Sequence, residues 1–165
     1  MSIEFIRRSY RPVRIRLLLV GESPPASGDF FYTGGNMTAF TETAFSRATG
    51  RDYSSPEEFL KAFKRSGCYL EDLCRKPINK QSRSERKRAH GASIIPLAAR
   101  LRQLNPDAVV IVMRAIALPV KTAVTTAGLS CPVYVLPFPG NGHQNTYIKQ
   151  LVPLIKQRSR KTRSI

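Results

Sequence analysis

Four short apolar segments, separated by stretches with helical periodicity, constrain the fold of this chain more than any other feature. They cover residues 15–20, 68–73, 107–113 and 132–136, and helices are predicted over residues 37–47, 56–65, 93–104, 115–127 and 143–158. Strands that alternate with helices pair in parallel through right-handed crossovers. The sequence therefore predicts an α/β fold, a three-layer sandwich with a four-stranded parallel sheet.

Length and composition indicate one domain over residues 1–165, with a basic arm at 1–14 and a basic tail at 156–165. No apolar run reaches the length of a membrane span, and no signal peptide is recognisable. We expect a monomeric cytoplasmic protein with no membrane partner, associated with the nucleoid if it is bacterial. The three cysteines form no CxxC pair, so they are interpreted as buried apolar residues, and we expect no metal and no cofactor.

The charge is strongly unbalanced, with 27 lysines and arginines against 11 acids and a net charge of +16. The basic residues are segregated: between Arg75 and Arg88, predicted as part of a basic loop over 75–91, Glu85 is the only acid. An excess of this size predicts attraction to polyanions, and nucleic acid, most simply DNA, is the favoured partner.

Ligands of open parallel sheets bind beyond the carboxyl ends of the strands. Three predicted loops lie there, residues 21–36, 72–91 and 137–143. The first places the carboxylate of Glu22 directly after a buried strand and carries three successive aromatic residues, 30–32, which suit base stacking. Alternatively, Glu22 caps a helix and the aromatic rings fill the core. The last loop is rich in glycine and leads into a helix, so its backbone N–H groups suit a phosphate, although Asn141 and His143 also suit helix caps.

Three segments taken together resemble the uracil-DNA glycosylase superfamily. They are residues 21–25 (GESPP), 68–77 (CYLEDLCRKP) and 136–141 (LPFPGN). The first is similar to the family's first motif in the variants with glutamate at the catalytic position, and Phe31 lies where the family stacks an aromatic ring on the flipped base. Strands and loops follow the family's order from about residue 15 to 155.

The resemblance implies a uracil-DNA glycosylase-like fold and hydrolysis of the N-glycosidic bond of a modified base in DNA, as in base excision repair. The family takes the base out of the stack into a pocket. Catalytic roles are then expected for Glu22 and His143, and base contacts for Phe31, Asp72 and Phe138. Nucleic-acid contacts are expected from Ser23, Arg75, Lys76, Arg83, Arg86, Lys87, Arg88, His90, Gly140, Asn141, Gly142 and Gln144.

The chain departs from the family pattern at two positions. Phe138 stands where the last motif has histidine, and Asp72 where a base-reading asparagine is usual. An ionised aspartate accepts hydrogen bonds but donates none, so it suits a base that presents an amino or N–H group, unless Asp72 is protonated or the protein is inactive. Residues 87–90 (KRAH) also resemble a basic loop ending in histidine in one branch that becomes covalently trapped on DNA; contact with phosphates is the simpler interpretation.

Two other functions remain open. The chain can be a nucleic-acid-binding module that keeps the fold without the chemistry, because a fold does not guarantee an activity. It can also be a protein-interaction component whose basic surface meets an acidic protein or ribosomal RNA.

Overall fold

The computed structural model describes residues 1–160, and it has a four-stranded sheet in which every pair of neighbours is parallel. The strands are β1 (Leu17–Gly21), β2 (Cys68–Asp72), β3 (Val109–Ile111) and β4 (Val133–Val135), in the spatial order β2-β1-β3-β4. The α/β class, the parallel sheet and its four strands are therefore confirmed.

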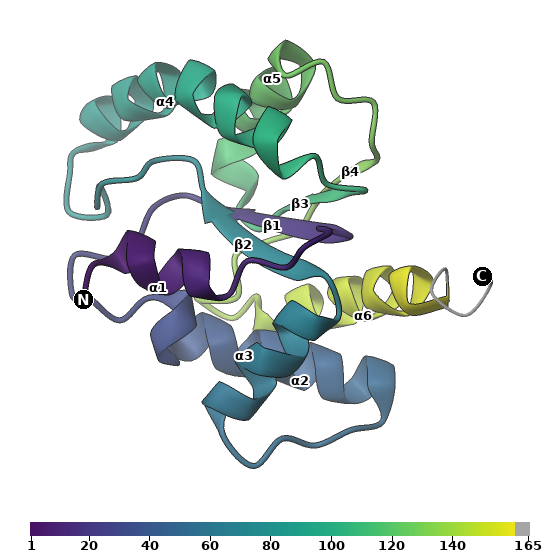
Figure 1. Ribbon diagram of the computed structural model, residues 1–165. Helices are drawn as coiled ribbons and strands as arrows, with labels where there is room; N and C mark the ends of the chain where they lie inside the picture. The colour runs from purple at the N-terminus through teal and green to yellow at the C-terminus, as the bar shows by residue number, and fades with distance from the viewer. Residues whose placement is uncertain (161–165) are drawn as a thin grey trace.

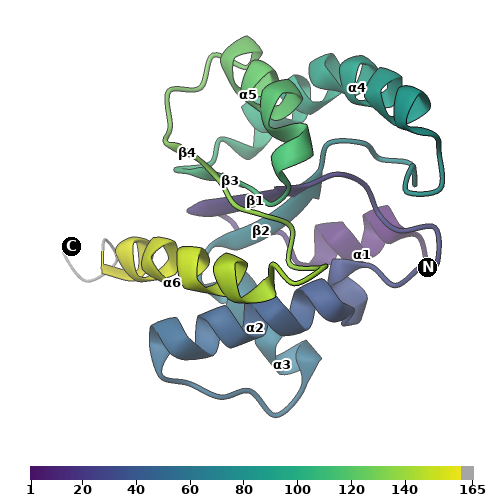
Figure 2. The same cartoon turned by 180° about the vertical axis from the view of Figure 1, so that it is seen from behind.

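Helices cover both faces of the sheet, which makes three layers (Figures 1 and 2). Helix α4 packs against α5 on one face, and α2, α3 and α6 lie on the other. The helices are α1 (Ile3–Ser9), α2 (Asn36–Thr49), α3 (Pro56–Arg65), α4 (Arg83–Leu104), α5 (Ala117–Thr126) and α6 (Gln144–Arg160), with short 3₁₀ turns η1 (Phe31–Thr33) and η2 (Arg114–Ile116).

The two central strands are apolar because they have no face toward solvent. All five residues of β1 and all three of β3 are buried, and Val20 of β1 pairs with Ile111 of β3. The edge strand β4 is only partly buried along its length. Continuous apolar sequence is what a parallel strand covered on both sides requires.

Helix α4 begins ten residues earlier than the sequence periodicity predicts. The hydroxyl of Ser82 accepts from the backbone N–H of Glu85, and the Glu85 carboxylate accepts from the N–H of Ser82, which together form a capping box. The prediction of a basic loop over residues 75–91 is therefore wrong from Arg83 onward. The Ser-x-x-Glu spacing that signals this start is visible in the sequence, but no apolar periodicity follows it for two turns.

The predicted basic arm at residues 1–14 is also not an arm. Ser2 caps α1 by accepting from the N–H of Phe5, and the helix lies beside the carboxyl end of β2, where the side chain of Arg7 is fully buried. Residues 156–160 of the predicted tail belong to α6, and residues 161–165 lie outside the described residues. No helix within residues 1–160 is both long and apolar enough to cross a membrane.

The last residue of β1 must be small because β2 approaches it closely. A Cβ atom on Gly21 would lie 2.8 Å from Oδ1 of Asp72. Gly91, in the interior of α4, has no such neighbour, since a Cβ there meets nothing within 4 Å.

We expect opposite effects when these two glycines are replaced. Gly21→Ala should lower the free energy of unfolding by about 1–3 kcal/mol, because the methyl group overpacks the strand end. Gly91→Ala should raise it by roughly 0.5–1 kcal/mol, since alanine loses less conformational entropy in a helix. Urea denaturation followed by circular dichroism measures both, and equal effects would contradict the close contact at Gly21.

Candidate nucleic-acid and catalytic site

A pocket of about 900 Å³ opens at the carboxyl ends of the two central strands. Glu22, which follows β1, and Met113, which follows β3, both line it. The chain places β2 on one side of β1 and β3 on the other, so the strand order reverses between β1 and β3. Open parallel sheets bind ligands at this reversal. The pocket therefore lies where the fold class is expected to place its functional site.

The carboxylate of Glu22 forms the polar floor of this pocket, and two side chains of α4 hold it. Its side chain is only 9% exposed. Arg86 donates from Nε to Oε1 at 3.1 Å, and its Nη2 donates to both carboxylate oxygens at 2.7 Å. His90 Nε2 lies 2.8 Å from Oε1. Arg86 and His90 are four residues apart, so one face of α4 presents both to the end of β1.

The contacts at Glu22 assign a role to each member of the group. Arg86 and His90 together contact both carboxylate oxygens, so the three side chains hold one another in place. An ionised carboxylate only accepts hydrogen bonds, so the nitrogen of His90 that faces it is the donor. In the neutral ring, Nδ1 is then an acceptor that can take a proton, the arrangement in which a carboxylate positions a histidine base.

The remaining walls of the pocket are basic on one side and apolar on the other. Arg83 and Lys87 add to the positive charge of Arg86 along the first turns of α4. The apolar wall comes from Ile94 of α4, Met113, and Ala115, Leu118 and Pro119 of η2 and α5. A flat apolar ring beside a phosphate fits such a combination.

Five residues that line this pocket were predicted from the sequence as separate nucleic-acid or catalytic positions: Glu22, Arg83, Arg86, Lys87 and His90. The sequence did not show that Arg86 and His90 contact Glu22, because 64 and 68 residues separate them from it. Recognising that residues 83–91 are helical would have placed Arg86 and His90 on one face.

None of the residues predicted to contact the base, Phe31, Asp72 and Phe138, lines this pocket. Phe31 is 5% exposed, and its ring packs against Tyr32 and Phe63 with centroid distances of 5.1 and 5.2 Å. This packing agrees with the alternative interpretation that the aromatic rings fill the core. Phe138 is 46% exposed and lies over Gly140, where a Cβ would come within 3.1 Å of the ring.

Residues 140–143 form the turn that precedes α6, and Asn141, Gly142 and His143 are exposed on the surface. His143 is exposed; its backbone N–H donates to the carbonyl of Gly140 and its carbonyl accepts from Tyr147. It does not line the pocket, so the geometry brings His90 and not His143 to Glu22. Asn141 has a positive φ of 51° within this turn, and Gln144 is the first residue of α6.

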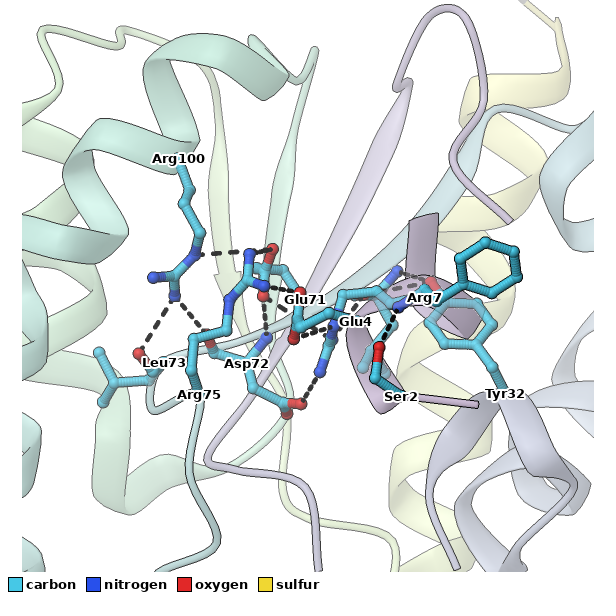
Figure 3. A network of polar contacts seen from close by, with 11 residues as sticks. Ser2, Glu4, Arg7, Tyr32, Glu71, Asp72, Leu73, Arg75 and Arg100 are labelled. Carbon is cyan, nitrogen blue, oxygen red and sulfur yellow. Dashed lines mark hydrogen bonds and ion pairs between the residues drawn. The ribbon is translucent and has the colours of Figure 1, made fainter. Parts of the chain in front are cut away.

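Asp72 belongs to a buried ion cluster on the other side of the strand ends (Figure 3). Arg7, which is 1% exposed as a side chain, donates to Oδ2 of Asp72 at 2.7 Å and to the carbonyl of Leu70 at 3.1 Å. With its carboxylate bound in this way and only 4% of the residue exposed, Asp72 presents no open edge to a base.

Four further charged residues complete this cluster. Glu71 lies 3.0 Å from Arg75 and 3.6 Å from Arg100, and Arg75 also contacts Glu4. Burial raises the pKa of Glu71, while Arg7 and Arg100 oppose that rise. Burial and the neighbouring Arg100 lower the pKa of Arg75 to about 10. Three guanidinium groups and three carboxylates, Arg7, Arg75, Arg100, Glu4, Glu71 and Asp72, therefore neutralise one another.

The remaining predicted contacts are dispersed. Ser23 accepts from the N–H of Ile78 and so fixes the loop after β1. Lys76 and Arg88 are exposed outside the pocket.

Within residues 1–160, no three histidine, cysteine, aspartate or glutamate side chains gather as metal ligands. The cysteines are unpaired, and burial raises the pKa of the Cys68 thiol to about 12.

Comparisons with known proteins do not extend these observations. The sequence matches no protein-family model and no curated protein at a significant level.

Removing the charge of Arg7 should strongly destabilise the domain. In the variant Arg7→Met, Asp72 and Glu71 stay buried without their main cation, and we expect the free energy of unfolding to fall by about 3–5 kcal/mol. Arg8→Met is the matched control, because Arg8 is exposed on the same helix and should change stability by less than about 0.5 kcal/mol. Equal effects in chemical denaturation would show that the buried cluster does not hold α1 in place.

Proposed function

We propose that this protein hydrolyses the N-glycosidic bond of a modified base in DNA, with the pocket at Glu22 as its active site. The observation that carries the proposal is the contact of 2.8 Å between His90 and Glu22, inside a pocket with a basic rim at the reversal of strand order. The resemblance of residues 21–25 to the first motif of uracil-DNA glycosylases supports the reaction class and a fold of that type.

In the proposed reaction, water attacks C1′ of the sugar while the bond from C1′ to the base nitrogen breaks. The departing base keeps the electron pair of that bond and takes up a proton, and the sugar receives the hydroxyl group. His90 accepts the proton of the attacking water, and Glu22 stabilises the imidazolium that forms. This assignment differs from the sequence-based expectation, in which His143 was the catalytic histidine.

Positive charge at the pocket suits the substrate. Arg83, Arg86 and Lys87 lie along one side of the pocket, where they can bind phosphates flanking a flipped nucleotide. The apolar wall formed by Leu118 and its neighbours can receive the base once it has left the stack. A base bound against this wall would exclude water from the pocket, which strengthens the hydrogen bonds made at Glu22 and His90.

Binding without catalysis is the second candidate, and one observation favours it. Arg86 engages both oxygens of Glu22, which is also the geometry of a purely structural ion pair. In that case the pocket binds nucleic acid, and Glu22 serves only to fix the start of α4.

The two histidines of the chain provide a matched test of the proposed reaction. Oligonucleotides that carry uracil, hypoxanthine, xanthine or mismatched thymine, single- and double-stranded, would be assayed for alkali-sensitive cleavage under single-turnover conditions. We expect His90→Ala and Glu22→Gln to lower the rate of base release by roughly 10²–10⁴-fold, because each removes part of the acid–base pair. His143→Ala and Glu57→Gln should leave the rate unchanged, since neither residue lines the pocket.

Two outcomes would contradict the assignment. Loss of activity in His143→Ala with full activity in His90→Ala would move the active site to the turn before α6. If no lesion is released while the same oligonucleotides bind at low salt, the binding module becomes the better description.

A further inference from the structure

We infer that a second groove, at the end of the sheet where the strands begin, binds the phosphate backbone of a nucleic acid. This groove has a volume of about 480 Å³. It lies where α2 and α3 end and beside the last turn of α6, on the side away from the strand carboxyl ends (Figure 1). The proposal concerns binding alone and does not depend on the reaction proposed for Glu22.

Three cations converge on this groove without an acid to balance them. They are Arg51, Arg65 and Lys156, and no acidic residue appears among the described residues that line it. Asp52 follows Arg51 in the sequence but does not line the groove. Arg65 has only a weak electrostatic interaction with Glu58, whose carboxylate is already bound by Ser54.

These three side chains differ from the wholly or partly buried arginines at the carboxyl ends of the strands. Arg7, Arg75, Arg86 and Arg100 all form ion pairs with carboxylates. Within residues 1–160, Arg51, Arg65 and Lys156 form neither an ion pair nor a hydrogen bond, and all three are exposed. Their donors therefore remain available to an external acceptor.

Helix electrostatics alone do not account for the arrangement. Cations are favoured at the carboxyl ends of helices, and this preference explains Arg65 in the last turn of α3 and Lys156 near the end of α6, while Arg51 lies just beyond the end of α2. The preference is satisfied when a cation lies anywhere around its own helix end. It does not explain why two cations from α3 and α6 and a third from the loop after α2 line the same concave surface.

The chemistry of the groove selects phosphodiesters and not a particular base. Guanidinium groups bind phosphate oxygens with paired hydrogen bonds. Among the hydroxyl groups of the groove, those of Thr49 and Ser159 donate to carbonyls of their own helices, which leaves those of Tyr53 and Ser66 to donate outward. Contacts of this kind position a nucleic-acid backbone without reading its sequence.

The position of the groove determines what it can do. It lies at the amino ends of the strands, between α2, α3 and α6. The pocket at Glu22 lies at the carboxyl ends of the strands, between α4 and α5. A segment bound in one is therefore on the opposite side of the domain from a segment bound in the other. Two such sites allow one protein molecule to hold two stretches of nucleic acid.

The test uses the whole chain and two triple variants with equal loss of charge. The groove variant is Arg51→Gln, Arg65→Gln and Lys156→Gln. The control variant is Arg47→Gln, Lys121→Gln and Lys149→Gln, three exposed cations outside the groove. Circular dichroism first verifies that both variants are folded. The measurements are the slope of log Kobs against log[salt] for a long duplex, and the capture of a second, labelled duplex by protein bound to an immobilised one.

We expect the groove variant to reduce the magnitude of the salt slope by about 3, because it removes three phosphate contacts, and to abolish capture of the second duplex. The control variant should retain capture and most of the slope. Equal losses in both variants, or capture by the groove variant at the level of the native chain, would overturn the inference. Base release by the groove variant is measured separately, so a failure of the groove and a failure of the proposed reaction are distinguished.

Discussion

The buried contact between Arg7 and Asp72 fixes the polar end of this sheet. A guanidinium group with no exposure is unfavourable unless carboxylates and carbonyls surround it, and here the end of β2 supplies both. The same contact ties α1 to the edge strand and removes Asp72 from solvent. The open pocket is therefore confined to the other side of the strand ends, at Glu22.

The carboxylates of Asp72, the last residue of β2, and of Glu22, the residue after β1, consequently have different environments. Asp72 is part of a neutral cluster whose partners come from α1, the loop after β2, and α4. Glu22 faces a pocket, and its partners both come from the first turns of α4. Helix α4 therefore contributes to both sites: Arg100 near its end stabilises the cluster, while Arg86 and His90 near its start form the candidate active site.

The architecture could be predicted from the sequence because local signals determine it. Apolar runs such as residues 15–20 and 107–113 indicate central strands, and Ser55 with Pro56 marks the start of α3. The candidate site could be predicted from the sequence only in part. Glu22 stands out after its strand. The contacts of Arg86 with Glu22 and of Arg7 with Asp72 each span more than 60 residues, which periodicity does not report. The start of α4 was missed because its first two turns are almost entirely polar.

The separation in sequence between Glu22 and its partners has a kinetic consequence. The first turn of α4 can form locally through its Ser82 cap, but the ion pair with Glu22 closes a loop of 64 residues and requires β1, β2 and the core beneath them. A partly folded chain would carry the basic helix without the carboxylate beside it. In such a species Arg83, Arg86 and Lys87 would carry positive charge that no carboxylate of β1 balances. Any attraction of polyanions to this helix would then precede the formation of the pocket at Glu22.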